Sequence, residues 1–500
     1  MRIILKLLIL FIGLALVAAA PAQADIKISA GKTSNMTCAA GVCSPTANKA
    51  VLNVSDLESM LASGNVTVTT TGSGTVQAGK IDITAALTWS TSSILTLDTD
   101  PPNANGLTTA INISAPVSVT GTGGLTINNP AAGWNLAFTG NGNITFAKLT
   151  SSFVMNANSW VLVDNVAGLA TAVADGDCCI ALAQSYDASN DGTYSGPPAG
   201  TVSYFEGLGN SISNLTINDP QQEDPNDGLF KDVAGSVANF GLSNISITNQ
   251  PSEGGAVAGP VAAAASGTFF RCWATGTMNV ENVAGGLVGL LGGGVLESWT
   301  NVSITVDGGS YAGGIAGQAK NGHPVIQRSF ALGPVTANQD SALIGGLVGE
   351  YSGGNGDTVS ESYSTGAVTL NTAINNSSQV GGMIGVTDGG GSVAVANQTY
   401  STGEVSAPAS SCGTNNNCVG GWVGADFNGS AYKHNYWDRT TSGITNRSQG
   451  VGNIPSDAGV KGLTSTQLSS GLPKGFSSKI WAENPNINGG LPYLIGNPPP

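Results

Sequence analysis

The sequence is short of charged residues, histidine and aromatic residues, and each shortage argues against a class of protein. Charged residues make up 10% of the 500 positions, aromatic residues make up 6%, and histidine occurs only at His323 and His434. Helical domains are rich in Lys, Glu and Leu, so this composition does not favour them. Neither histidine accompanies a Gly-Asp-Ser-Gly or Gly-x-Ser-x-Gly motif, so no serine catalytic triad is expected.

Basic residues and long apolar runs are also scarce. The chain has 17 Lys and Arg against 31 Asp and Glu, which gives a formal net charge of −14. Nucleic acids and anionic membranes both bind basic surfaces, so neither is expected as a partner. The longest apolar run after the N-terminus, residues 259–265, is interrupted by Pro260. No membrane insertion is therefore expected.

The first residues have the pattern of a secretory signal peptide. Arg2 and Lys6 flank the start of an apolar run over residues 7–20, and residues 22–24 (Ala-Gln-Ala) have the small-x-small pattern of a cleavage site. We therefore predict a signal peptide over residues 1–24 and a mature chain that begins at Asp25. Such a chain would be secreted or held at a bacterial cell surface.

The seven cysteines are consistent with an oxidising compartment. Two pairs enclose short loops and are candidates for disulfides: Cys38 with Cys43, and Cys412 with Cys418. The others are the neighbours Cys178 and Cys179, whose pairing stays open, and Cys272, which is expected to be a buried free thiol. No histidine lies near the pairs, so zinc is not expected, and no other metal site is predicted.

Glycine is abundant, with 71 residues, and it recurs in six Gly-Gly blocks. The second glycines of these blocks lie 31, 28, 32, 36 and 39 residues apart, at Gly255, Gly286, Gly314, Gly346, Gly382 and Gly421. Such a period predicts stacked supersecondary units. Paired glycine at each corner is expected to allow a positive φ and a close approach of successive turns of the chain.

One aromatic residue follows each glycine block. These residues lie 26, 31, 33, 37 and 36 positions apart, at Trp273, Trp299, Phe330, Tyr363, Tyr400 and Tyr436. In strands stacked about 4.8 Å apart they would form a ladder of rings. Such a ladder could be a sugar-binding platform or a stack in the core. The core stack is favoured, because each repeat must bury one face against its neighbours.

The predicted fold is all-β, a right-handed parallel β-helix (solenoid) with a short N-terminal capping helix. A capping box over residues 55–58 opens this helix, which runs through Ala62 and is closed by Gly64. A second short helix is expected from Val161 to Ala174. The predicted regions are coils with the cap (25–150), an irregular junction (151–250), the repeats (251–440) and a closing segment (441–500).

Two groups of polar residues are candidate sites. Asp187, Ser189, Asp191 and Gly192 have the spacing of a calcium-loop start, but Pro198 stands where a bidentate Glu is needed, so an Asx-rich turn is favoured. The charged residues of the last coil could form the clustered carboxylates and the nearby Lys or Arg of a polysaccharide lyase or hydrolase: Asp426, Lys433, Asp438 and Arg439. Solvated charges are the favoured interpretation, so no catalytic or cofactor-binding residue is predicted.

The repeats carry a resemblance to known families. Gly-Gly-Leu-Val-Gly blocks that alternate with Ser-Tyr-Ser-Thr-Gly strands resemble the GLUG-motif repeats of bacterial secreted and surface proteins; residues 205–217, 435–438 and 491–494 are similar to the flanks of such repeats. The strands Leu87–Trp89 and Leu95–Leu97 resemble the filamentous-haemagglutinin family. These resemblances imply a parallel β-helix and an exported adhesin.

The expected function is therefore multivalent attachment at a cell surface without catalysis. Rows of Ser, Thr, Asn and Tyr on a rigid rod would provide many weak contacts that sum to a useful avidity. The expected partners are glycans or proteins on host or neighbouring cells. A carbohydrate-active β-helix enzyme and a purely structural envelope protein are the alternatives.

Overall fold

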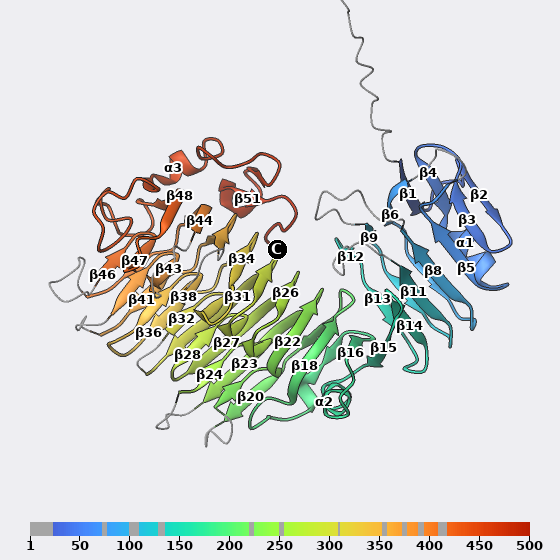
Figure 1. The fold of residues 1–500 in the computed structure, drawn as a ribbon, viewed down its shortest axis with the longest axis horizontal. Helices are drawn as coiled ribbons and strands as arrows, with labels where there is room; N and C mark the ends of the chain where they lie inside the picture. Colours follow the sequence, from blue (N-terminus) through green and yellow to red (C-terminus); the bar gives the residue numbers. More distant parts are fainter. Residues whose placement is uncertain are drawn as a thin grey trace, which may run out of the picture.

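Parallel β-strands, with few helices, make up most of the structure. The computed structural model describes residues 24–72, 78–99, 110–128, 136–219, 225–249, 255–308, 311–352, 358–372, 378–388, 395–408 and 418–500. The strands follow one another along a curved array, from the N-terminal part (blue) to the C-terminal part (red) in Figure 1. Within the described residues, no helix is both long and apolar enough to cross a membrane.

Successive repeats add strands to four parallel ladders. The first ladder is β21 (Asn226–Asp227), β24 (Val257–Ala258), β28 (Val283–Gly285), β32 (Tyr311–Gly313), β37 (Leu343–Gly345), β42 (Gln379–Gly381) and β46 (Cys418–Gly420). The second is β22 (Phe230–Ala238), β25 (Ala262–Ala265), β29 (Val288–Leu291), β33 (Ala316–Ala319), β38 (Val348–Tyr351), β43 (Ile384–Thr387) and β47 (Val423–Asp426). Neighbouring strands of a ladder lie one repeat apart in the sequence, as the glycine period predicts.

The other two ladders meet at the long strands of the repeats. The third contains β26 (Thr268–Phe270), β30 (Gly294–Leu296), β34 (Val325–Gln327), β39 (Thr358–Ser360), β44 (Val395–Ser401), β48 (Ala431–Asp438) and β49 (Val460–Leu463). The fourth contains β20 (Thr216–Asp219), β23 (Gly241–Asn249), β27 (Trp273–Val280), β31 (Trp299–Val306), β35 (Phe330–Ala331), β36 (Val335–Ala337), β40 (Tyr363–Ser364), β41 (Val368–Leu370) and β45 (Val405–Ser406).

The N-terminal half is built in the same way. Its parallel strands are β1 (Ala24–Ser29), β4 (Ala50–Asn53), β6 (Ala78–Ile83), β9 (Ile111–Ile113) and β12 (Leu136–Phe138); β7 (Leu87–Trp89), β10 (Val117–Val119) and β13 (Ile144–Phe146); and β3 (Val42–Pro45), β5 (Val66–Thr69), β8 (Ile94–Asp98), β11 (Gly124–Asn128) and β14 (Ser152–Met155). The short alternating apolar patterns between residues 66 and 146 all form strands, because alternate side chains face the core.

The junction between the halves is less regular. It contains β15 (Asn158–Val163), β16 (Cys179–Leu182), β17 (Tyr186–Asp187), a 3₁₀ turn (Ala188–Asn190), β18 (Ala199–Glu206) and β19 (Ser211–Ser213). It also contains α2 (Val166–Ala174), which starts later than the expected Val161. The reason is local: residues 158–163 pair with β14 and β16, and the side chain of Asn165 then caps the helix by accepting the Gly168 N–H.

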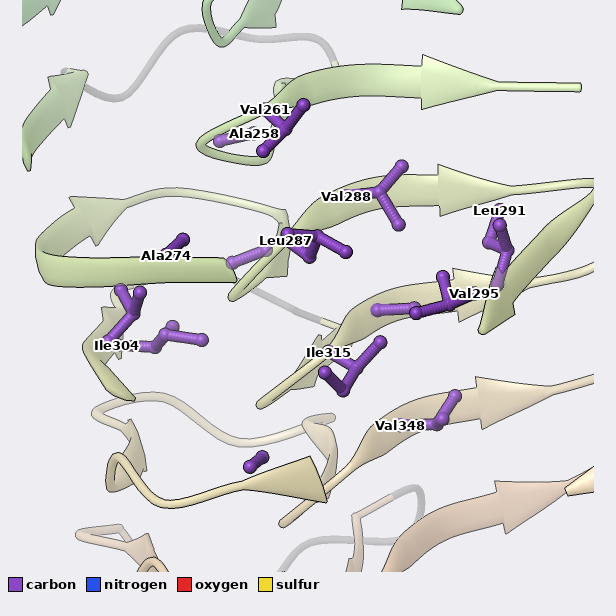
Figure 2. Packing of buried hydrophobic residues seen from close by; sticks show 14 of the residues in the cluster. Ala258, Val261, Ala274, Leu287, Val288, Leu291, Val295, Ile304, Ile315 and Val348 are labelled. Carbon is purple, nitrogen blue, oxygen red and sulfur yellow. The ribbon is translucent and has the colours of Figure 1, made fainter. Parts of the chain in front are cut away.

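The core follows the interior of the array. One cluster of buried apolar side chains extends through the repeats, and a second fills the N-terminal half. Leu287, Ile315 and Val348, from successive repeats, project into the same interior in Figure 2 and are fully buried. Burial of this apolar stripe by each neighbouring repeat is the main stabilising contribution that the array can make.

Glycine at the corners allows a close approach of successive repeats. A Cβ added at Gly286, Gly314, Gly346 or Gly382 would lie 2.0, 2.4, 2.3 or 2.4 Å from the carbonyl oxygen of the corresponding glycine in the next repeat. The expected positive φ was wrong for these corners, since of the six second glycines only Gly255 has one. Their role is to let neighbouring backbones pack without a side chain between them.

The first of the six predicted glycine corners was wrong. Val257 pairs with Val283 and Ala262 pairs with Val288, which places Pro260, not Gly255, opposite Gly286. Gly255 is exposed, and a Cβ there would meet nothing. The step to the next corner is therefore 26 residues, equal to the spacing of the first two aromatic residues.

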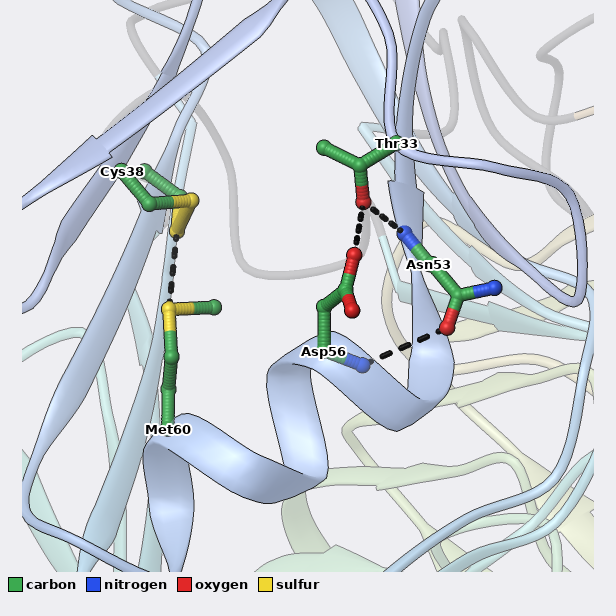
Figure 3. The surroundings of a disulfide bond; sticks show 6 residues. Thr33, Cys38, Asn53, Asp56 and Met60 are labelled. Carbon is green, nitrogen blue, oxygen red and sulfur yellow. Dashed lines mark hydrogen bonds between the residues drawn. A yellow bond between two sulfur atoms is a disulfide. The ribbon is translucent and has the colours of Figure 1, made fainter.

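The N-terminal cap is α1 (Val54–Leu61), whose N-cap is Asn53 and not the expected Ser55. The Asn53 side chain accepts the N–H groups of Ser55 and Asp56 at 2.9 and 3.3 Å, and Thr33 bonds both the Asn53 N–H and the Asp56 carboxylate (Figure 3). Strand β2 (Met36–Ala39) pairs with β3 beside this helix. These bonds hold the helix over the end of the N-terminal core.

The cysteines fall into three states. Cys38 and Cys43 form a disulfide, and Cys418 also takes part in one, although its expected partner Cys412 lies outside the described residues. Cys178 and Cys179 are free thiols with sulfur atoms 2.7 Å apart. Cys272 is a free thiol with no exposed surface, and burial raises its pKa to about 12.

We expect Gly349→Ala to destabilise the repeats. The added methyl would lie 2.6 Å from both the Ala312 nitrogen and the Gly317 oxygen, so the backbone must move. Overpacking of this kind costs about 1–3 kcal/mol. Denaturant midpoints check this expectation, with Gly64→Ala as the control, since a Cβ at Gly64 meets nothing within 4 Å. Equal midpoints for the two variants would contradict it.

Candidate functional site

Five aromatic rings form a continuous stack along the repeats. Trp273, Trp299, Phe330, Tyr363 and Tyr400 follow one another with centroid distances of 5.5, 6.1, 4.7 and 5.0 Å. Neighbouring ring planes are within 7° of parallel. Tyr436 continues the backbone register of this ladder, opposite Tyr400. The stack exists because each ring occupies the same place in an in-register parallel strand.

The ladder lies outside the main core. Side chains alternate along a strand, and the neighbours Ala274 and Ala331 belong to the main core, so the rings project to the opposite face. Here they form a separate cluster with residues of the closing segment, among them Phe476, Trp481 and Leu494. The expectation of a stack inside the main core was therefore wrong, because the C-terminal segment supplies the cover.

The closing segment is held on the ladder by hydrogen bonds. The Tyr400 hydroxyl donates to the Pro492 carbonyl at 2.6 Å and accepts from the Asn488 amide at 2.7 Å. The Tyr436 hydroxyl donates to the Lys474 carbonyl at 2.7 Å. The segment also contains α3 (Ser465–Leu468) and the antiparallel pair β50 (Trp481–Ala482) and β51 (Tyr493–Leu494). The covered rings are Phe330, Tyr363, Tyr400 and Tyr436, each at most 5% exposed.

The stacking leaves no free ring face for a sugar. A platform for sugars needs an exposed aromatic face, but here each inner face is occupied by the next ring. The outer face of Trp273 lies over Gly241, where an added Cβ would be 2.1 Å from the indole Cε2. Trp273 and Trp299 are nevertheless partly exposed, so they can offer their edges to a ligand.

A second ladder of charged side chains runs beside the rings, two residues earlier in each repeat. Arg271 bonds Glu297 at 2.9 Å, and Arg328 reaches Glu297 at 3.6 Å and Glu361 at 2.8 Å. All four residues have a positive φ near 50°, as do Gln398 and His434 at the same place in the next repeats. Sequence reasoning missed this ladder, although the fixed offset from the aromatic residues could have revealed it.

A pocket of about 830 Å³ lies at the exposed end of the aromatic ladder. Its walls come from three parts of the chain: the N-terminal half with Lys80 and Phe138, the repeats with Trp273 and Trp299, and the C-terminal residues 496–498. In Figure 1 the C-terminus lies on the inner side of the curved array. Arg271 joins the first two walls, since its Nη1 donates to the Leu136 carbonyl at 2.8 Å.

Asn239 and Glu206 form a buried polar pair behind this pocket. The Asn239 amide donates to Glu206 at 3.0 Å, and the Leu208 N–H donates to the same oxygen at 3.0 Å. Burial raises the pKa of Glu206 to about 7, and these bonds and the charge of Arg271 oppose the rise. Asn239 lines the pocket, and its Oδ1 has no hydrogen-bond partner among the described residues.

A row of polar side chains, the polar row, crosses the fourth ladder. Each member pairs in register with the next, over Asn218, Thr248, Asn279, Thr305, Thr336, Thr369 and Ser406. All seven are exposed or partly exposed. Their sequence neighbours on the opposite face, such as Ile304 and Val335, are buried. The row repeats a hydroxyl or amide at about 4.8 Å intervals.

In the charged set of the last coil, the two carboxylates stabilise turns of the backbone. Asp426 is 4% exposed and accepts bonds from the Thr387 hydroxyl and the Ser430 N–H at 2.8 and 2.9 Å. Asp438 is 1% exposed and accepts the Thr440 N–H at 2.7 Å. Arg439 donates to the Gly462 carbonyl, and Lys433 is exposed. The two carboxylates therefore close turns of the backbone.

The residues of the calcium-like spacing also bond protein groups. Asp187 accepts the Ser189 N–H at 3.0 Å and the Asn214 amide at 2.7 Å. Asp191 accepts the hydroxyls of Tyr186 and Tyr194. Among the described residues, no group of three or more His, Cys, Asp or Glu is placed to hold a metal ion.

Comparison with known proteins gives little beyond this geometry. No family model matches the chain, and neither does any curated protein. Among solved structures, the chain is similar to a crystal structure from Bacteroides ovatus of a "putative immunoglobulin A1 protease", at 17% identity and a TM-score of 0.39. The match covers 63% of this chain and 85% of that one. A likeness of this degree supports no argument about function.

We expect Glu206→Gln to change how stability depends on pH. Because burial raises the pKa of Glu206 from 4.5 to about 7, the folded state holds a proton that the unfolded state has lost between these values. Stability should therefore fall as pH rises from about 4.5 to about 7, by on the order of 3 kcal/mol.

Gln keeps an acceptor for Asn239 and Leu208 but cannot ionise. The variant should lose this part of the pH dependence and be the more stable protein at pH 8. Denaturant unfolding of the two proteins at pH 5 and pH 8 gives the difference between their free energies of unfolding at each pH. The contributions of the other titrating groups are the same in both proteins and cancel in this difference. An identical pH dependence in both proteins would contradict the assignment.

Proposed function

We propose that this protein is an exported adhesin that attaches to surface glycans by many weak contacts, without catalysis. The parallel array would be a right-handed β-solenoid, the elongated form that multivalent binding requires. GLUG-type repeats and a filamentous-haemagglutinin-like N-terminal half agree with this proposal, as does a cleaved signal peptide over residues 1–24. The partners would be polysaccharides on host or neighbouring cells.

The polar row is the observation that carries the proposal. Seven hydroxyl or amide side chains lie in register on successive strands, and the strands that hold them are fixed by a continuous core. Such a row offers hydrogen-bond donors and acceptors at a constant spacing to an extended polymer of hydroxyl-rich units. Single contacts are weak, but contacts on one rigid surface act together.

The pocket beside Trp273 and Trp299 supports the same function. It combines aromatic edges with polar side chains, the mixture that binding pockets for small organic molecules use. The cations on its wall are already paired, Lys80 with Asp82 at 3.1 Å and Arg271 with Glu297 at 2.9 Å. A neutral terminal sugar would therefore suit this pocket better than an acidic one.

The test compares two pairs of substitutions on the same polysaccharides. Thr305→Val with Thr336→Val removes two adjacent hydroxyls of the polar row and keeps the side-chain shape. Loss of two hydrogen bonds should weaken binding to neutral polysaccharides roughly tenfold. Thr268→Val with Thr358→Val is the matched control, since both threonines are partly exposed on the third ladder, away from the row.

The measurement is retention of the mature chain on immobilised neutral polysaccharides and whole cells, with product analysis on the same samples. Saturable binding without products, lost in the row variant alone, is the expected result. Shortened or unsaturated sugars would overturn the proposal in favour of an enzyme. Absence of binding to any cell or polysaccharide would overturn it in favour of a structural envelope protein.

A further inference from the structure

We propose a further binding site, for a tetrahedral oxyanion such as a sulfate or phosphate ester on a sugar, at the C-terminal end of the array. The site is a cavity of about 240 Å³, called here the lysine pocket. Its lining includes Lys433, Lys461, Lys474 and His434. It is separate from both the polar row and the pocket beside Trp273.

The backbone fixes the four basic residues around this cavity. Lys433 and His434 belong to β48, and Lys461 of β49 lies opposite Tyr436 in the parallel pair. Lys474 comes from the closing segment, where its carbonyl accepts the Tyr436 hydroxyl at 2.7 Å. The next residue, Gly475, lies against the His434 ring, since a Cβ there would be 2.3 Å from His434 Cγ. The convergence is thus built into the packing.

The three lysines of the pocket form no ion pair with the described residues of the protein. In the described part of the chain, no Asp or Glu oxygen lies within 4.0 Å of the amino group of Lys433, Lys461 or Lys474. The lining residues include no carboxylate. Burial and then the charges of Lys433, Lys474 and Lys461 lower the pKa of His434.

Such a cluster is unusual in this chain. The whole sequence has only 17 Lys and Arg and a net charge of −14, and three of its lysines meet here. Like charges that gather without partners repel one another, and a bound anion relieves this repulsion. Because the rest of the surface is mostly acidic, an anionic ligand would be attracted at this point and not along the molecule.

The residue types favour a tetrahedral oxyanion. Lysine acts as a point charge whose three donors can reach several oxygens of a sulfate or phosphate group, whereas the planar Arg fork binds carboxylates and phosphates in a fixed bidentate geometry. The lining has three lysines and no arginine. Its volume is below the roughly 300–1,000 Å³ of pockets for drug-sized ligands, so it suits one anionic group and the part of a sugar ring that carries it.

Tyr432 and Tyr436 also line the cavity. The site therefore adds an acidic-sugar specificity to the proposed attachment function, although the binding of an oxyanion does not depend on that function. A sulfated polysaccharide and free inorganic phosphate or sulfate offer the same chemistry, and the experiment separates these sources.

The experiment measures binding of the full mature chain by titration calorimetry, with inorganic sulfate, inorganic phosphate, a sulfated polysaccharide and its desulfated form as probes. The test variant carries Lys433→Gln, Lys461→Gln and Lys474→Gln, three exposed positions whose change should leave the fold intact. The control variant carries Lys27→Gln, Lys49→Gln and Lys148→Gln, exposed lysines of the N-terminal half with the same loss of charge.

The expected result is that the sulfated polymer binds, that added salt weakens it, and that only the test variant loses affinity, by at least roughly tenfold. Preference for the free anions over the sulfated polymer would keep the oxyanion site but overturn its assignment to sugars. Equal binding by the test variant and the wild type, or an equal loss in both variants, would overturn the site itself.

The same samples separate this proposal from the attachment function. The variant with Thr305→Val and Thr336→Val should keep its affinity for inorganic sulfate, and the lysine variant should keep its binding to neutral polysaccharides. If the lysine variant binds the probes as the wild type does and the threonine variant does not, the lysine pocket is overturned and the polar row is retained. If the threonine variant binds as the wild type does and the lysine variant does not, the polar row is overturned and the lysine pocket is retained.

Discussion

In-register parallel pairing between successive repeats is the constraint on which the rest of the structure depends. Because each strand pairs with the strand one repeat later, any residue type that recurs at a fixed place becomes a continuous feature along the molecule. The apolar column that includes Leu287 and Ile315 becomes the core, and the recurring aromatic residue becomes a ring stack. The threonines and asparagines of the outward positions become the polar row by the same rule.

The sequence carried the information for these periodic features and little for the others. Apolar alternation located the strands between residues 66 and 146, and the aromatic spacing predicted the stack with its register. Local chemistry was less decisive: a capping box suggested Ser55 as N-cap, but Asn53 takes that role because Thr33 holds it there. The prediction of a corner at Gly255 was wrong for a related reason. A glycine pair can be recognised in the sequence, but it forms a corner only where the neighbouring strand is in register.

Contacts between distant segments lay beyond sequence reasoning. Periodicity shows that a strand has a second face but not what covers it, so it does not show that Trp481 covers Tyr363 and Tyr400. The pocket beside Trp273 has the same origin, because its walls join residues 80, 138, 273 and 497. The alternating charged ladder is different, because the sequence already contains its fixed offset from the aromatic residues. Its members are Arg271, Glu297, Arg328 and Glu361, and the offset became meaningful only once the register of the rings was known.

The two ends of the aromatic ladder differ because the repetition stops there. At one end Gly241 takes the place of a ring, so Trp273 keeps an exposed edge beside a pocket whose charges are paired. At the other end Lys461 follows Tyr436 in register, and the closing segment brings Lys474 to the same cavity, so positive charge collects without a partner. A repetitive array suits a repetitive ligand, whereas specificity for one chemical group needs a place where the repeat is broken. Both pockets lie at such a break, which is why the proposed neutral and anionic sites are at opposite ends of one ladder.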